Sequence, residues 1–451
     1  MKKLITAAIL TAAALSLATA QNFPKRGLCY NSLNDAEMKS MEGGNVAWGY
    51  NWAQSPASDE EKIGPGKQMD FFPMIWGGNQ DFKAMYDKAR EYLQKTPGVK
   101  VLLGFNEPMM KNRYGGCDLT PKTAAKLWPY LEALADEFNL ELAGPALTWG
   151  FEPLEEDGKI WGTPEAWMDE WIKQYKKKNK KREPRFDYLV LHSYMDYPQA
   201  VMWFCDKYGE MYNKPVLLTE FCAWDQDPNQ QPHQSQAAQM ESMTQKVEAM
   251  DNDPRVAGYC WFMSHCPTDT VPFNGMWYEK GGDGKMTELG LVYTFMSTCD
   301  KSKWHSVGEV IAATDYIASS NYDFTVGEKP ESGERYMKPL SLSANSDPET
   351  KDKFPIQIGN FGTGRWTNYQ IKIPEDGKYK VNIRYSTNHE MDFFIYEDGN
   401  EIYHGNLPGT EEKWTSISIP VDLTSGDHTI KLYNRGGNRL VSKMSSVQIT
   451  K

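Results

Sequence analysis

Apolar and aromatic residues recur along the first two thirds of the chain in short runs, each followed by a polar loop and then by a stretch with helical spacing. Near-continuous apolar runs of this length are typical of strands that are buried on both faces of a sheet. The eight runs are RGLCYN (26–31), NVAWGYNW (45–52), DFFPMIWG (70–77), VKVLLGFN (99–106), ELAGPA (141–146), DYLVLHSY (187–194), VLLTEF (216–221) and VAGYCWF (256–262).

Helical patterns separate these runs, for example residues 81–95 and 121–138, the second opened by Thr120 as the N-cap and by Pro121 at the first helical position. Strands that alternate with helices pair in parallel. Eight such units in this length predict a closed (β/α)8 TIM barrel. An open doubly wound sheet is the alternative, but no glycine-rich phosphate loop follows the first run.

After Cys299 the helical periodicity stops and alternating strands follow at intervals of roughly ten residues, separated by turn signals. This pattern predicts an antiparallel β-sandwich. Its strands are expected at 366–374, 377–387, 391–399, 401–405, 414–423, 428–437 and 445–451. We therefore predict a barrel domain over residues 21–304 and a sandwich domain over residues 305–451.

Residues 1–20 have the layout of a signal peptide, with two lysines, an apolar run and an Ala18-Thr19-Ala20 ending. No cysteine follows the cleavage site to carry a lipid, and no later apolar run reaches the roughly 18 residues that span a bilayer. The protein is therefore predicted to be secreted or periplasmic.

The formal net charge of −11 argues against nucleic acid or an anionic membrane as a partner, because both require a basic surface. The one basic run, from Lys176, is expected to be a solvated helix end. The 15 Trp and 24 Tyr residues include enough rings for sugar stacking as well as for a core. Carbohydrate therefore stays open as a ligand, and we expect a monomer.

The seven cysteines are an odd number, so at least one is unpaired in a monomer, and they lack the short paired spacings of a zinc site. Cys222 with Cys260, and Cys266 with Cys299, are two possible bridges, and buried thiols are the alternative. No metal and no cofactor are expected.

Two carboxylates stand where strands end. Glu107 closes the fourth run behind Asn106 and before Pro108, and Glu220 closes the seventh run. Catalytic groups of a TIM barrel lie at these strand ends. A pair of carboxylates is what glycosidic bond cleavage requires, because one must donate a proton and the other must support the positive charge on the sugar.

Other polar and aromatic residues follow the same strand ends, where they can bind sugar hydroxyls or stack on sugar rings. The candidates for substrate binding are Asn51, Trp52, Trp76, Asn106, His192, Tyr194 and Trp261.

The order of AWGYNWA, FFPMIWG, GFNEP, LHSY, LLTEF and GYCWF resembles glycoside hydrolase family 128 within the clan A retaining glycoside hydrolases, over roughly residues 26–300. The resemblance implies a β-1,3-glucanase with a laminarin-like substrate. It implies that Glu107 is the acid/base, Glu220 the nucleophile, Asn106 a ligand of the sugar 2-hydroxyl, and Tyr194 the residue that orients the nucleophile. A retaining mechanism predicts carboxyl groups about 5 to 5.5 Å apart and a raised pKa for Glu107.

The run from residue 358 to 387 resembles carbohydrate-binding module family 6. Trp366, Tyr369 and Tyr379 are expected in its core, and the family places a stacking ring and an amide where this chain has Trp414 and Asn438. Calcium stays open, because IAATDY has Ala where a Glu is usual. A sandwich that only supports the barrel is the alternative.

Three other functions remain. The chain could act on another linkage or polysaccharide, it could be a transglycosylase, or it could be a surface-glycan-binding protein that has lost catalysis. The presence of both Glu107 and Glu220 argues against the last.

Overall fold

A computed structural model describes most of the chain in two compact units. The described residues are 22–57, 61–78, 81–149, 152–156, 158–224, 235–265, 273–321, 340–436 and 442–451. The first unit comprises Met1–Glu42, Val46–Gln234 and Asp253–Met286, and the second Gly43–Asn45, Ser235–Asn252 and Thr287–Lys451. The predicted signal peptide lies outside the described residues, and the domain boundary near residue 305 stays a prediction.

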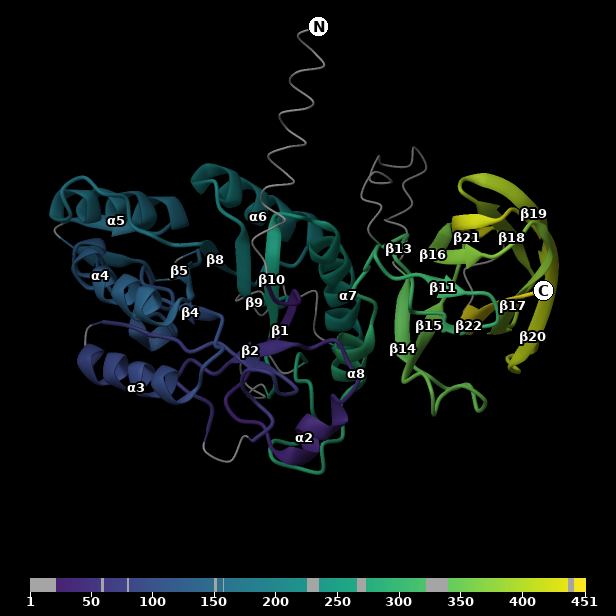
Figure 1. Ribbon diagram of the computed structural model, residues 1–451, viewed down its shortest axis with the longest axis horizontal. Coiled ribbons are helices and arrows are strands. Elements are labelled where there is room, and N and C mark those ends of the chain that lie inside the picture. Colours follow the sequence, from purple (N-terminus) through teal and green to yellow (C-terminus); the bar gives the residue numbers. More distant parts are fainter. Residues whose placement is uncertain are drawn as a thin grey trace, which may run out of the picture. The chain divides into compact units, whose positions relative to one another are not determined.

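The first unit is built around eight parallel strands (Figure 1). Their order in the sheet is β3-β2-β1-β10-β9-β8-β5-β4. The strands are β1 (Arg26–Cys29), β2 (Trp48–Tyr50), β3 (Asp70–Phe71), β4 (Val101–Leu103), β5 (Glu141–Leu147), β8 (Tyr188–Ser193), β9 (Val216–Phe221) and β10 (Val256–Phe262).

The residues that follow β3 pair with β4, and this pairing closes the sheet into a barrel. Met74 forms a parallel bridge with Leu103, the Ile75 N–H donates to the Leu103 carbonyl at 3.0 Å, and the Leu103 N–H donates to the Pro73 carbonyl at 2.9 Å. Inward-facing side chains such as Trp48, Val101 and Leu217 fill the interior as one apolar cluster. The predicted (β/α)8 barrel is thereby confirmed.

Helices follow most of these strands, and their caps agree with the sequence pattern. Thr120 accepts a hydrogen bond from the Thr123 N–H at 3.3 Å, with Pro121 at the first helical position. The unit also contains a hairpin and a 3-10 turn. Its remaining elements are α2 (Asp35–Ser40), α3 (Phe82–Lys95), η1 (Asn112–Tyr114), α4 (Pro121–Phe138), β6 (Leu154–Glu156), β7 (Lys159–Trp161), α5 (Pro164–Lys178) and α6 (Pro198–Tyr212).

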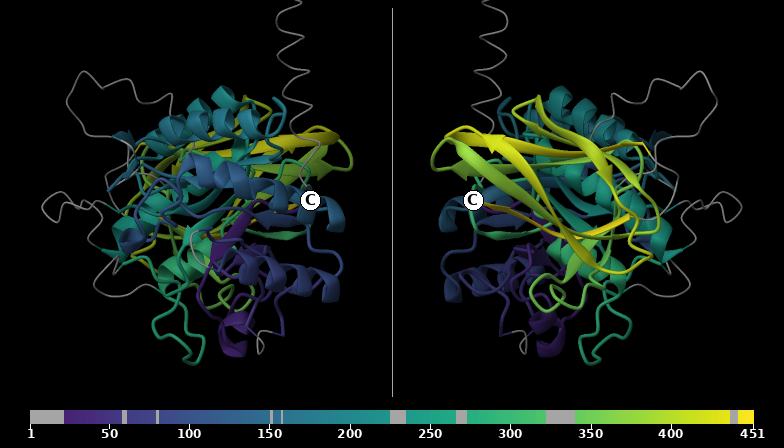
Figure 2. Two further views of the ribbon diagram at one scale, coloured as in Figure 1. Left: turned by 90° about the vertical axis from the view of Figure 1, so that its left-hand side faces the viewer. Right: turned by 90° about the vertical axis from the view of Figure 1, so that its right-hand side faces the viewer.

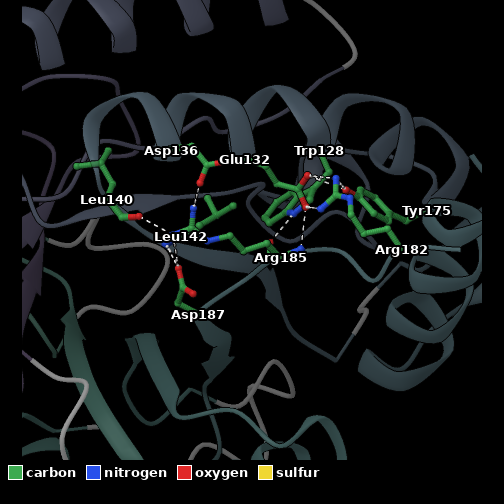
Figure 3. A network of polar contacts seen from close by, with 9 residues as sticks. All are labelled: Trp128, Glu132, Asp136, Leu140, Leu142, Tyr175, Arg182, Arg185 and Asp187. Carbon is green, nitrogen blue, oxygen red and sulfur yellow. Dashed lines mark hydrogen bonds and ion pairs between the residues drawn. The ribbon is translucent and has the colours of Figure 1, made fainter. Parts of the chain in front are cut away.

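The buried carboxylate of Glu132, on α4, holds the loop that leads from α5 into β8 (Figure 3). It accepts hydrogen bonds from the Tyr175 hydroxyl at 2.6 Å, from the Arg182 guanidinium at 2.5 and 3.2 Å, and from the Arg185 N–H at 2.7 Å. The start of β8 is therefore tied to α4 through charge-assisted hydrogen bonds.

Arg185 extends the same network to β5 (Figure 3). Its guanidinium donates to the Leu140 carbonyl at 2.8 Å and to Asp187 at 2.9 Å, and Asp187 in turn accepts from the Leu142 N–H at 2.7 Å. The Trp128 indole N–H donates to the Arg185 carbonyl at 2.8 Å. These bonds fix the register at which β5 and β8 enter the barrel.

The described residues of the second unit form two helices and two sheets, in which all strand pairs except the parallel pair β11–β16 are antiparallel. The longer strands of the sandwich are drawn in green and yellow in Figure 2. One sheet has the order β11-β16-β21-β18-β19, and the other β14-β15-β22-β17-β20. The elements are α7 (Gln236–Asn252), α8 (Glu288–Phe295), β11 (His305–Ser306), β12 (Val310–Ala312), β13 (Ala318–Ser319), β14 (Ser341–Ala344), β15 (Ile356–Asn360), β16 (Arg365–Ile373), β17 (Gly377–Thr387), β18 (Met391–Glu397), β19 (Asn400–Leu407), β20 (Thr415–Leu423), β21 (Gly426–Gly436) and β22 (Ser442–Thr450).

The predicted sandwich is confirmed, and its alternating residues form the core between the sheets. In β17, Tyr379, Val381, Ile383 and Tyr385 are buried, while the residues between them are more exposed. No helix within the described residues is long and apolar enough to cross a membrane.

The Glu132 network gives a test of stability. Glu132→Gln removes the charge that Arg182 and the Arg185 N–H contact in a buried position, and we expect it to lower the free energy of unfolding by about 1 to 3 kcal/mol. The measurement is urea unfolding followed by Trp fluorescence.

Glu137→Gln is the matched control, because this residue lies on the same helix and pairs with Arg90, but on the exposed surface. We expect no measurable change from it, since exposed pairs contribute little. Equal effects of the two substitutions would contradict the role given to Glu132.

Candidate active site

Glu107 and Glu220 lie together at the carboxyl-terminal end of the barrel strands. Glu220 is in β9, and Glu107 follows β4. Both are buried, with 5% and 4% of their surface exposed. One oxygen of each carboxyl group and one ring nitrogen of His192 all lie within 4.8 Å of one another. The two groups are thus close enough to act on one bond.

The backbone at Glu107 turns sharply to present this side chain. Its φ is 43°, in the left-handed region that is costly for a residue other than glycine. The Asn106 N–H donates to the Trp76 carbonyl at 2.8 Å, and the Asn106 carbonyl accepts from the Cys117 N–H at 2.9 Å, which holds the turn from both sides. A Cβ at Gly116 would lie 2.2 Å from the Met110 carbonyl oxygen, so this loop needs a glycine to close.

Three hydrogen-bond donors converge on Glu220. The Tyr50 hydroxyl and the Trp52 indole N–H donate to Oε1 at 3.1 and 2.9 Å, and the Tyr194 hydroxyl donates to Oε2. Donors of this kind stabilise an ionised carboxylate and restrict its rotamer. The Glu220 carboxyl group is therefore fixed in one orientation.

His192 lies between the two carboxylates. Its Nδ1 is 2.9 Å from Glu107 Oε1 and 3.4 Å from Glu220 Oε2, and its Nε2 is 2.9 Å from the Thr219 hydroxyl. A register shift between Leu191 and His192 makes His192 the direct partner of Glu220 across β8 and β9. Irregular pairing of this kind often re-aims side chains next to active sites.

Burial raises the pKa of the Glu107 carboxyl, the charge of Glu220 raises it further, and the hydrogen bond from His192 partly opposes both. Burial lowers the pKa of His192, but the two carboxylates outweigh it, so that the net shift is upward. Glu107 therefore keeps its proton to a higher pH than an ordinary glutamate does. A raised pKa is what a proton-donating carboxyl group requires.

Asn106 has one unused acceptor in this site. Its Nδ2 donates to the Gly115 carbonyl at 3.1 Å, whereas its buried Oδ1 accepts no hydrogen bond within the described residues. A buried acceptor without a partner is costly unless a ligand supplies the donor. A sugar hydroxyl is such a donor.

The other residues predicted for this end of the barrel take different positions. Trp52 is partly buried and donates to Glu220 rather than only offering a ring face. Trp76 packs on the edge of the barrel core. Asn51 holds its own loop, accepting from the Ala53 N–H at 3.1 Å and donating to the Ser55 carbonyl at 3.2 Å.

Trp261 does not lie in this group. Trp261 pairs with Phe221 across β10 and β9, and the centroids of their rings are 5.2 Å apart. Because Phe221 and Glu220 are consecutive in β9, their side chains point to opposite faces of the sheet. Trp261 therefore lies on the face opposite to that of Glu220. Its ring is fully buried, and its indole N–H donates to the Asn274 carbonyl at 2.7 Å. A buried indole cannot stack on a sugar, so the substrate-binding role predicted for Trp261 does not fit the structure.

Phe262 takes the place that was expected for Trp261. The centroid of its ring is 6.2 Å from that of Trp52 and 5.4 Å from that of Tyr194, and both contacts are edge-on. Sequence reasoning also missed Tyr50 and Thr219. The sequence could have indicated Tyr50, because it lies two residues before Trp52 in the same strand run and residues two apart in a strand share a face.

The group Glu107, His192 and Glu220 is the arrangement within the described residues that could hold a metal ion. A cation would have to displace the three donors that already contact the oxygens of Glu220. It would also compete with the His192–Glu107 hydrogen bond. The donor set therefore fits an acid and a nucleophile better than a metal site.

Cys260 is a free, buried thiol, so the possible Cys222–Cys260 bridge does not form. Cys29 is likewise a free thiol, and its Sγ donates to the Trp261 carbonyl at 3.1 Å. Cys266, one half of the other possible bridge, lies outside the described residues.

In the sandwich, Tyr369 and Tyr379 are buried as predicted, and their hydroxyls donate to the carbonyls of Ala313 and Glu375 at 2.6 and 2.7 Å. Trp414 is partly buried directly before β20. Asn438 lies outside the described residues. Glycan binding by Trp414 and Asn438 therefore stays a prediction.

Comparison with known families identifies both parts of the chain. The model of the glycosyl hydrolase catalytic core matches residues 27–293. The chain belongs to this family, and it is a glycoside hydrolase. The model of carbohydrate binding module family 6 matches residues 340–451.

Solved structures of similar chains include two glucanases. A family 128 (subgroup II) endo-β-1,3-glucanase from Pseudomonas viridiflava is 31% identical, with a TM-score of 0.50, and the match covers 60% of this chain and 96% of that one. A subgroup II endo-β-1,3-glucanase from Sorangium cellulosum is 29% identical, with a TM-score of 0.48, over 60% of this chain and 97% of that one. Among curated proteins, none matches the sequence.

The hydrogen bonds to Glu220 lead to a prediction for the hydrolase. Trp52→Phe keeps an aromatic ring but removes the N–H that donates to Glu220. We expect kcat to fall by roughly 10- to 100-fold, the size that corresponds to about 1.5 to 3 kcal/mol for a hydrogen bond to a carboxylate. The measurement is steady-state hydrolysis of the polysaccharide that the wild type cleaves fastest.

Trp76→Phe is the control, because it shortens a partly buried ring at the same end of the barrel without removing a donor from Glu220. We expect less than about a three-fold change in kcat. A loss of kcat in Trp76→Phe as large as in Trp52→Phe would show that ring size, and not the N–H, matters.

Proposed function

We propose that the protein is an exported, retaining glycoside hydrolase that cleaves β-1,3-glucan. The main support for the mechanism is the separation of the carboxylates, since oxygens of Glu107 and Glu220 lie within 4.8 Å of each other. Retaining enzymes place the two groups about 5 to 5.5 Å apart, and inverting enzymes leave a wider gap for water. Support for the linkage comes from the similar endo-β-1,3-glucanase of Pseudomonas viridiflava.

In the first step, the Glu220 carboxylate attacks the anomeric carbon while Glu107 gives its proton to the departing glycosidic oxygen. A covalent glycosyl-enzyme forms and the aglycone leaves. In the second step, Glu107, now ionised, takes a proton from water, and the water oxygen displaces Glu220 from the sugar. Both glutamates end in their starting protonation states.

The neighbouring residues support this cycle. Tyr50, Trp52 and Tyr194 hold the nucleophile in one rotamer. Asn106 Oδ1, which is otherwise without a partner, accepts a hydrogen bond from a hydroxyl of the sugar. His192 stabilises the ionised form of Glu107 that acts as the base in the second step.

The sandwich, which matches carbohydrate binding module family 6, binds the same polymer and keeps the hydrolase near it. Export rests on the N-terminal signal-peptide pattern of residues 1–20.

We expect Glu107→Gln and Glu220→Gln each to lower kcat/KM on linear β-1,3-glucan by at least about 1,000-fold, because each removes one proton-transfer or nucleophilic group. The measurement is reducing-sugar release, with β-1,4- and β-1,6-glucans in parallel. Proton NMR of the first product then reports its anomeric form, which retention predicts to be β.

Glu141→Gln is the control, because this glutamate contacts Tyr188 at the opposite end of β5. It should retain nearly full activity. Wild-type activity on a different glucan would overturn the linkage, an α-anomeric product would overturn retention, and silence on all three polymers would favour a binding protein.

The activity should depend on pH through Glu107. Its pKa is raised, and the first step needs its protonated form, so kcat/KM falls as the pH rises through that pKa. His192→Leu removes the hydrogen bond that lowers this pKa, so we expect the alkaline limb of the kcat/KM profile to move to higher pH.

His192→Gln keeps a side-chain N–H donor and should move the alkaline limb less than His192→Leu. A limb that moves to lower pH, or stays in place while kcat falls, would argue that His192 acts on another group.

A further inference from the structure

Two tryptophans of the barrel unit are exposed, although most of the described indoles of that unit are buried. Trp149 is 40% exposed and Trp203 is 50% exposed. The fully or nearly buried indoles are Trp48, Trp128, Trp161, Trp167, Trp171, Trp261 and Trp277. Large rings left in water at neighbouring positions often mark a binding surface.

A single ammonium group lies against both exposed rings. Lys207 Nζ is 5.8 Å from the centroid of Trp149 and 5.3 Å from that of Trp203. It is also 3.3 Å from Glu165 Oε1 and 3.2 Å from the Tyr208 hydroxyl. The two indoles are therefore close enough for one oligosaccharide to contact both, and Lys207 is fixed between them.

The pair lies toward the carboxyl-terminal end of the barrel, where Glu107 and Glu220 are found. Trp149 comes two residues after β5, and β5 is bridged to the Glu107 turn through Ala146 and Asn106. Trp203 is in the second turn of α6, the helix that follows the His192 strand. Trp149 also contacts Phe204 of α6 at 6.4 Å, which joins the two positions into one surface.

We propose that Trp149, Trp203 and Lys207 form a second glucan-binding surface on the barrel, separate from the Glu107–Glu220 site, which holds a distant part of a long chain. The apolar faces of glucose rings stack on the two indoles, and the Lys207 ammonium donates to a sugar hydroxyl. The inference uses the proposed β-glucan substrate for the identity of the ligand.

The chemistry of the surface favours a neutral sugar. The one positive charge is already balanced by Glu165, so the surface has no net charge to attract an ionic partner. Its exposed groups are ring faces and a hydrogen-bond donor, the combination that recognises a glucan in water. Its position at the active-site end lets one long chain reach both places.

The test compares long and short substrates in the full chain. In the double variant Trp149→Ala/Trp203→Ala, kcat/KM on β-1,3-glucan polymer should fall about ten-fold, while hydrolysis of an aryl β-1,3-glucobioside, which fills only the cleavage site, should change less than about two-fold. Tyr130→Ala is the control, since Tyr130 is a 54% exposed ring on α4 that contacts Phe82 and Tyr86.

Binding is measured separately by affinity electrophoresis in gels that contain the polymer, in a Glu220→Gln background. The sandwich contributes equally to every variant, so a retardation that is weaker only in the Trp149/Trp203 double variant supports the proposal. Equal retardation of all variants, or equal losses on polymer and glucobioside, would overturn it.

The experiment distinguishes a failure of the second binding surface from a failure of the proposed β-1,3 linkage. If the wild type cleaves a different glucan, the linkage assignment fails, and the same comparison with that polymer and its aryl glycoside still decides the role of the two tryptophans. If the wild type cleaves no glucan, unchanged retardation of the double variant in every polymer gel overturns the second surface as well.

Discussion

Two buried carboxylates that lie within 4.8 Å of each other are the constraint on which the rest of this barrel depends. Two like charges at such a distance in a poorly solvated site raise the cost of ionising both. The residues around the two carboxyl groups offset this cost because each group has different neighbours. Glu220 receives three hydrogen-bond donors, whereas burial raises the pKa of Glu107 and the hydrogen bond from His192 partly opposes that rise.

The barrel supplies the accuracy that this arrangement needs. Glu107 has a left-handed backbone conformation between a strand and a proline, and backbone hydrogen bonds hold the turn on both sides. The loop that follows has no room for a side chain at position 116, so it needs Gly116 there. His192 comes into register with Glu220 through an irregularity in the pairing of β8 and β9. The Glu132 network on the outside of the barrel fixes the entry of β8, so a surface helix contributes indirectly to the position of His192. Strain near the active site is thus offset by ordinary hydrogen bonds farther away.

The aromatic residues of the chain divide into three roles. Some fill the barrel interior, as Trp48 does, and some donate hydrogen bonds to Glu220, as Trp52 and Tyr194 do. A third set, Trp149 and Trp203, remains exposed beside a fixed ammonium group. A polymer substrate is much longer than the site that cleaves it. Additional stacking surfaces, on the barrel and on the module-like sandwich, would raise its local concentration without changing the chemistry.

The sequence alone determined the two architectures and the two glutamates, because strand runs, helix caps and strand ends are local patterns that the chain displays in order. It did not determine which side of β10 faces the active site, and so it favoured Trp261 where Phe262 lies. The alternation of side chains gives a period of two but not its phase, and register shifts between neighbouring strands change that phase. The donors to Glu220 come from β2 and from the end of β8, distant in sequence from β9, so only the closed barrel could assign Tyr50 and Trp52 to its carboxylate.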